Sequence, residues 1–108
     1  MKSSTLKRIY KRYNRTYFDN QLPFEAIIIF RDIGADVDGL ASPWAWEIEL
    51  NKDLNSLDEI HGSLLHEMIH FWQYFVEDKD LEDEKEHHDI EFYFQALELY
   101  QLTGYPIA

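Results

Sequence analysis

Two histidines one helical turn apart stand in the middle of this chain, within residues 64–70 (Leu-Leu-His-Glu-Met-Ile-His). Residues four apart on a helix differ by about 40° around its axis, so His66 and His70 share one face. A helix is expected because residues 56–59 (Ser-Leu-Asp-Glu) fit a capping box and place two acids at the positive end of the helix dipole. This helix should run to Phe75 or Val76, packed by the apolar residues around the histidines.

The pattern His-Glu-x-x-His favours a zinc site. Both imidazoles can reach one ion, as tetrahedral zinc requires. Glu67 can then lie beside the metal, where it can take a proton from the water that the metal activates and pass it to a leaving amine. A catalytic zinc ion keeps one position open for water, so one more protein ligand is expected. The chain has no cysteine, so that ligand must be a histidine or a carboxylate.

We expect the third ligand at the start of the last predicted helix. The metzincin extension of the motif would need glycine at position 73 and histidine at position 76, where the sequence has Gln73 and Val76. The remaining candidates are Glu86, His87, His88, Asp89 and Glu91. His61 lies about 140° around the helix from His66 and is expected to face elsewhere.

The rest of the chain predicts a single α+β domain over residues 1–108. A first helix, capped by Ser3, Ser4 or Thr5, should end near Asn20, with Leu6, Tyr10, Tyr13 and Tyr17 facing the core. Strands are expected at residues 26–30 and 46–50, with a short one around Leu40 and Ala41. The last helix should span residues 89–102, after an acidic connection. Together these elements predict a small, mainly antiparallel, three-stranded sheet packed with helices.

Charge is distributed unevenly along the chain. The formal net charge is −11, yet residues 1–15 contain six of the ten basic residues and no acid. Contact with a nucleic-acid backbone is therefore expected, if anywhere, from the basic N-terminal helix, and a solvated helix face is the simpler interpretation. No apolar segment follows the N-terminus and no stretch reaches membrane-spanning length, so an intracellular, cytoplasmic protein is expected.

The sequence resembles the SprT-like metallopeptidases, whose best-known member is Spartan. The similar segments follow in that family's order: residues 14–22 (Asn-Arg-Thr-Tyr-Phe-Asp-Asn-Gln-Leu), 48–51 (Ile-Glu-Leu-Asn), 64–70 and 88–92 (His-Asp-Ile-Glu-Phe). The resemblance implies a minimal zincin-like core with Zn²⁺ as cofactor. It also implies the roles of four residues, namely His66, His70 and His88 as metal ligands and Glu67 as the catalytic base. His88 is preferred to His87 because Phe92 then matches the family's phenylalanine, four positions after the third histidine.

One position departs from the family pattern. The glycine that follows the third histidine is Asp89 here. Asp89 could cap the last helix, orient a ligand imidazole, or bind the metal itself. His87 is interpreted as a solvated loop residue.

The resemblance implies a zinc-dependent endopeptidase that acts on peptide bonds of protein substrates, in several members near DNA. The alternative is a non-catalytic zinc domain that recruits a protein or nucleic-acid partner. Glu67 argues against it, because a structural zinc site needs no base and normally closes with a fourth ligand. A metal-free interaction domain is a third hypothesis.

Zincins commonly hold a peptide substrate as an extra strand at the sheet edge above the metal. We expect that edge to be the strand Ala45–Leu50, with Trp44 and Trp46 near the cleft. SprT-like members often carry a zinc ribbon as well. Because this chain has no cysteine, a bare protease core is expected.

Overall fold

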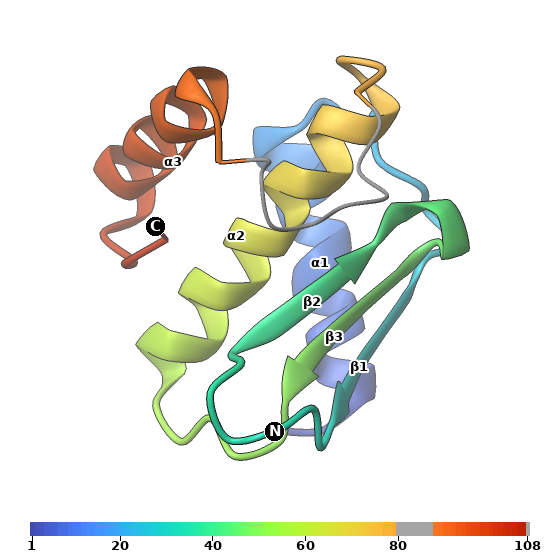
Figure 1. The fold of residues 1–108 in the computed structure, drawn as a ribbon, viewed down its shortest axis with the longest axis vertical. Helices are drawn as coiled ribbons and strands as arrows, with labels where there is room; N and C mark the ends of the chain where they lie inside the picture. Colours follow the sequence, from blue (N-terminus) through green and yellow to red (C-terminus); the bar gives the residue numbers. More distant parts are fainter. Residues whose placement is uncertain (80–87, 108) are drawn as a thin grey trace.

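A computed structural model describes residues 1–79 and 88–107 as three helices and a three-stranded sheet (Figure 1). In chain order the elements are α1 (Ser3–Tyr17), β1 (Ile27–Arg31), β2 (Gly39–Ser42), the 3₁₀ turn η1 (Pro43–Ala45), β3 (Glu47–Asn51), α2 (Leu57–Phe75) and α3 (Ile90–Thr103). The structure confirms the α+β class and the predicted order of helix, strands, helix, helix.

The sheet is mixed, where a mainly antiparallel one was expected. Its strand order is β1-β3-β2, with β1 parallel and β2 antiparallel to β3. The alternation of apolar and polar residues predicts which face of a strand is buried, but it does not predict which strand lies beside it. The strand order could therefore not be predicted from this pattern. The prediction that Ala45–Leu50 forms the sheet edge was wrong, because β3 is hydrogen-bonded on both sides. The outer strand that contacts α2 is β2.

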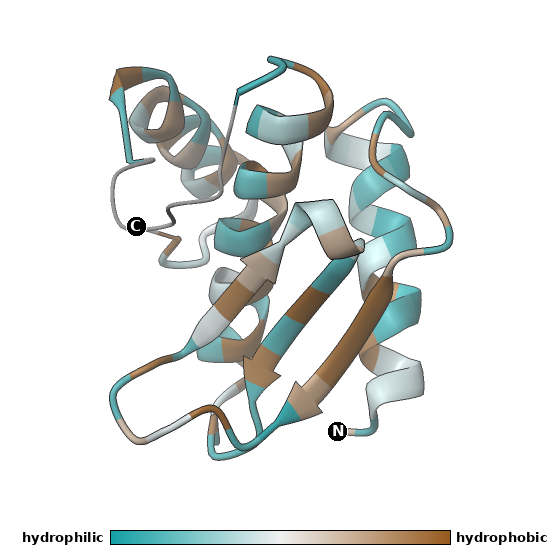
Figure 2. Cartoon of the chain, turned by 45° about the vertical axis from the view of Figure 1, so that its right-hand side comes forward, coloured by the Kyte–Doolittle hydropathy of each residue, from teal (hydrophilic) through white to brown (hydrophobic). Residues whose placement is uncertain are grey.

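The helices α1 and α2 cover one face of the sheet, and no helix in residues 1–79 or 88–107 covers the other, which is called the open face below (Figures 1 and 2). Ile48 and Leu50 of β3 are fully buried on the helix side. Glu47 and Glu49 point to the open face, where Arg31 lies 3.4 and 2.9 Å from their carboxylates. The central strand therefore alternates between hydrophilic and hydrophobic colours in Figure 2. This alternation is the pattern that identified β3 in the sequence.

Helix α1 packs on β1, and its residues Leu6, Tyr10 and Tyr13 are buried as expected. It ends at Tyr17 rather than near Asn20, because the backbone enters the left-handed region at residues 19 and 20. The amide of Asn14 holds this turn, since it both donates to the carbonyl of Leu22 (3.0 Å) and accepts from the Leu22 amide (3.1 Å).

Helix α2 runs through the centre of the molecule, between the sheet and α3. It begins as predicted: the Ser56 side chain accepts a hydrogen bond from the Glu59 amide at 3.1 Å and lies equally close to the Glu59 carboxylate. Most of its residues are buried, including the apolar neighbours of the two histidines.

No helix in residues 1–79 or 88–107 is both long and apolar enough to cross a bilayer. The cytoplasmic location and the single domain over residues 1–108 stay predictions.

Candidate metal centre

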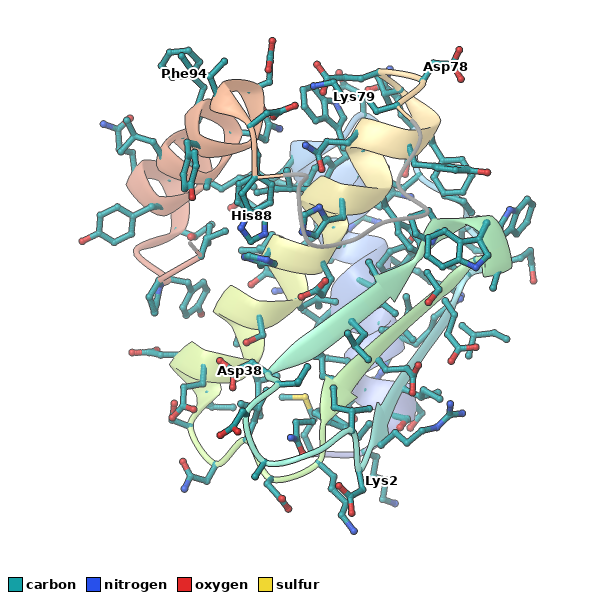
Figure 3. All side chains as sticks on the ribbon, in the orientation of Figure 1. Lys2, Asp38, Asp78, Lys79, His88 and Phe94 are labelled. Atoms are coloured by element: carbon teal, nitrogen blue, oxygen red, sulfur yellow. The ribbon has the colours of Figure 1, made fainter. Side chains whose placement is uncertain are left out.

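Three histidine rings converge beside α2. His66 and His70 come from α2, and His88 stands two residues before α3. The ring of His88 points towards α2 in Figure 3. One nitrogen from each ring lies within 4.8 Å of the others, and the ring centroids are 4.9 to 5.1 Å apart. Of the three candidates for the third position that the structure describes (His88, Asp89 and Glu91), His88 is therefore the one that lies with the other two histidines.

The donor set fits a metal ion. The Nε2 atoms of His70 and His88 lie 3.2 Å apart. Two nitrogens bound at about 2.0–2.1 Å to one tetrahedral ion would be about 3.3 Å apart, so this pair already has nearly the spacing of shared ligands. Neutral imidazole nitrogens suit zinc and the other transition metals. These three histidines could hold a metal ion.

In two of the rings, those of His66 and His70, Nδ1 forms a hydrogen bond to a group outside the histidine cluster. Nε2 of each ring then faces the other histidines. The carbonyl of Ile107 lies 2.7 Å from Nδ1 of His66, and a carbonyl can only accept, so Nδ1 carries the proton. Nδ1 of His70 lies 2.8 Å from Oε1 of Gln73 and donates in the same way. Each ring thus keeps the lone pair on Nε2, as a ligand imidazole must.

Burial keeps His66 in the form that can bind a metal. Removal from water lowers the pKa of His66, because it disfavours the charged ring, and the Ile107 carbonyl opposes this shift only in part. Because its pKa is lowered, the imidazole of His66 stays neutral at lower pH than an ordinary histidine does. His66 is therefore ready to act as a ligand at neutral pH.

Phe92 forms an apolar wall behind the three histidines. It is fully buried in the first turn of α3. Its ring centroid lies 4.9, 5.0 and 4.5 Å from those of His66, His70 and His88, respectively. The phenylalanine four residues after the third histidine thus restricts the positions of all three imidazoles.

Glu67 lies at the edge of the histidine cluster. Its carboxylate is 4.0 Å from Nε2 of His66, and only 6% of the residue is exposed. Gly39 of β2 makes room for it, because a Cβ at that position would lie 3.0 Å from Oε2 and 3.1 Å from Cγ of Glu67. The close packing fixes a carboxylate beside the ring of His66.

A hollow of about 420 Å³ opens beside His66 and Glu67. It is lined by residues before and within β2, by one face of α2 and by the segment after α3: Asp36, Val37, Asp38, Gly39, Glu59, Ser63, His66, Glu67, Pro106 and Ile107. Trp44 and Trp46, which were expected near the cleft, are not among these described lining residues. The ring of Trp46 packs instead on Phe75, at the far end of α2.

The other candidates for the third ligand have different surroundings. Asp89 caps α3, since its side chain accepts from the Phe92 amide at 2.9 Å. Glu91 lies 3.5 Å from the ammonium group of Lys79. Glu86 and His87 lie outside the described residues.

His61 faces away from the cluster, as predicted from its angle around the helix. Nδ1 of its ring lies 2.6 Å from the hydroxyl of Tyr13, and its ring stacks on Tyr105 at 4.7 Å.

The segment after α3 returns along α2, a feature that the sequence analysis missed. Its successive residues meet α2 in turn: Tyr105 stacks on His61, the carbonyl of Pro106 sits over Gly62, and the carbonyl of Ile107 reaches His66. A glycine inside a helix costs about 1 kcal/mol of stability relative to alanine, so its presence there indicates a neighbour that leaves no room for a side chain. Gly62 was the one such signal in the sequence.

Replacing Gly62 with alanine should weaken metal binding, although alanine favours the helix. An added Cβ would lie 1.9 Å from the Pro106 carbonyl oxygen, so the returning segment must move and His66 loses its outer hydrogen bond. Loss of such a partner typically lowers metal affinity about 10- to 100-fold. Zinc titration against a chromophoric chelator measures the change. Wild-type affinity in this variant would show that the segment does not position His66.

Comparison with family models matches the chain, over residues 6–108, to the one described as the SprT-like family. Comparison with curated proteins gives no match, and neither does comparison with solved structures.

Proposed function

The chain belongs to the SprT-like family, and on that premise we propose that it is a zinc-dependent endopeptidase that hydrolyses peptide bonds of protein substrates. The observation that carries the proposal is the convergence of three imidazoles beside a buried carboxylate at the wall of an open hollow. Family membership alone supports only a metallopeptidase-like domain. The arrangement of these four side chains supports hydrolysis.

His66, His70 and His88 would hold the zinc ion through Nε2. Three protein ligands leave a fourth position for water or substrate, as in catalytic zinc sites, whereas structural sites are usually closed by four. When bound, zinc polarises a carbonyl group and lowers the pKa of water. Zinc is preferred to magnesium, calcium or manganese because the three ligands are imidazoles, whereas those metals favour oxygen ligands.

Glu67 would act as the general base and then as the general acid. It would accept a proton from the attacking water while the water oxygen forms a bond to the carbonyl carbon. It would then deliver this proton to the amide nitrogen, so that the peptide C–N bond breaks and leaves a carboxylic acid and an amine. Its position supports this role, since it lies beside the ring of His66 and lines the hollow.

A peptide substrate would enter along β2. Among the described residues this strand is hydrogen-bonded to a neighbouring strand on one side only, to β3, and Gly39 at its start lines the hollow beside Glu67. An extended peptide could add to the free side through main-chain hydrogen bonds, which would place it across the hollow. Contact with DNA through the basic residues of α1 stays a prediction.

Metal analysis combined with a cleavage assay tests the proposal. We expect one equivalent of zinc per chain, together with cleavage of casein or of the chain itself that a chelator abolishes and added zinc restores. Bound zinc without any cleavage would favour the non-catalytic zinc domain. A chain that binds no metal would contradict both functions.

A further inference from the structure

Gln73 stands behind the second histidine of the cluster. It follows His70 by three residues on α2, and it is fully buried. Its Oε1 lies 2.8 Å from Nδ1 of His70. An amide can present either its oxygen or its NH₂ group to a ring nitrogen, and the two orientations require opposite tautomers of the ring. The orientation of the Gln73 amide therefore determines which ring nitrogen of His70 carries the proton and whether Nε2 has a lone pair for a metal.

Asp89 favours one of the two orientations. Its Oδ1 lies 3.3 Å from Nε2 of Gln73. A carboxylate only accepts hydrogen bonds, so the NH₂ group of Gln73 must face Asp89 and its oxygen must face His70. The oxygen accepts the proton of Nδ1, and Nε2 of His70 is left with its lone pair directed at the other histidines.

The same carboxylate also fixes the start of α3. Oδ1 of Asp89 accepts from the Phe92 amide at 2.9 Å, which caps the helix directly after His88. Its other oxygen pairs with the ammonium group of Lys79. Asp89 thus links the helix that carries His66 and His70 to the segment that carries His88.

We propose that Asp89 is a positioning residue of the metal centre. Through Gln73 it holds His70 in the tautomer that presents Nε2, and through the cap of α3 it holds His88 against α2. The inference rests on the metal-binding part of the proposed function and not on peptide hydrolysis. It gives a role to the residue that stands where the family resemblance leads one to expect glycine, since glycine has no side chain to form either contact.

The substitution Asp89→Ser separates the two contacts. Serine is as good an N-cap as aspartate, so α3 should keep its start. Its hydroxyl is one bond nearer to the backbone and falls short of Gln73. We expect the affinity for Zn²⁺, measured by competition with a chelator, to fall about 10-fold, as for the loss of an outer-shell partner. We also expect the d–d absorption spectrum of the Co²⁺-substituted protein to change.

Two further variants serve as controls. Asp89→Asn keeps an oxygen for the Phe92 amide and for Gln73, so metal affinity should return towards the wild-type value. Lys79→Met removes the ion pairs of Lys79 with Glu77, Asp89 and Glu91, which lie in partly exposed positions and should contribute little to metal affinity. In the metal-free protein, long-range ¹⁵N–¹H correlation spectra should show one tautomer of His70 in the wild type and a mixture in Asp89→Ser.

The outcomes separate this inference from the proposed function. If the wild type binds zinc and Asp89→Ser matches it in affinity, cobalt spectrum and tautomer, the positioning role is overturned while the zinc centre stands. If the wild type binds neither Zn²⁺ nor Co²⁺, the proposed metal centre is contradicted, and the positioning role of Asp89 is contradicted with it. Weaker binding in Asp89→Ser, with recovery in Asp89→Asn, supports the proposal whether or not the chain cleaves casein.

Discussion

Replacing Glu67 with glutamine should leave the metal in place and nearly abolish peptide hydrolysis. Glutamine has the same shape, so it should fit the space that Gly39 leaves beside residue 67, but its neutral amide cannot accept a proton from water. General acid–base catalysis typically contributes about 10²- to 10⁴-fold, so we expect kcat/KM to fall by a factor in that range. Zinc content, measured on the same preparation, should remain at one equivalent because Glu67 is not among the three converging ligands.

The matched control is Glu59→Gln. Glu59 also lies on α2 and lines the same hollow, but it is exposed and serves the capping box at the start of the helix. This variant removes the same charge from the same hollow, so it tests whether the loss in Glu67→Gln comes from the electrostatic field or from proton transfer. Cleavage by Glu67→Gln at the wild-type rate would exclude Glu67 as the base.

The helix with the two histidines was predictable because its signals are local. The capping box at Ser56 and the four-residue spacing of His66 and His70 depend only on near neighbours in the chain, and the structure confirms the helix from Leu57 to Phe75. The strand at residues 46–50 was found for the same reason. Its place in the sheet was not, because pairing with β1 and β2 depends on segments that the alternation pattern does not connect.

The third histidine, and the groups that hydrogen-bond to His66 and His70, could not be predicted from local sequence patterns. Spacing left several candidates near residue 88, and the family resemblance chose among them. The Ile107 carbonyl that meets His66 is a backbone group, which every residue has, so no residue type could indicate it. Gln73 entered the sequence analysis only as a mismatch to another motif. Its role depends on a fold that brings Asp89 to the back of α2.

Replacing His88 with alanine should remove tight metal binding with little effect on the fold. It takes away one of three imidazole ligands, and the loss should exceed the roughly 100-fold that an outer-shell substitution can cause. His88 is exposed and belongs to no helix or strand. The free energy of unfolding of the metal-free variant should therefore lie within about 0.5 kcal/mol of that of the metal-free wild type. Zinc competition and denaturant unfolding of the metal-free protein measure the two quantities separately.

The control for this substitution is His61→Ala. It removes an imidazole from α2 that bonds to Tyr13 and stacks on Tyr105, so it should lower stability. Zinc affinity should fall far less than in His88→Ala, because no ligand is lost and only the segment that supports His66 is loosened. The pair of variants therefore separates ligation from packing, because His88→Ala should change mainly the zinc affinity and His61→Ala mainly the free energy of unfolding. If His88→Ala still binds one equivalent of zinc as tightly as the wild type, the third ligand is another residue. A parallel His87→Ala variant then shows whether the neighbouring histidine provides it.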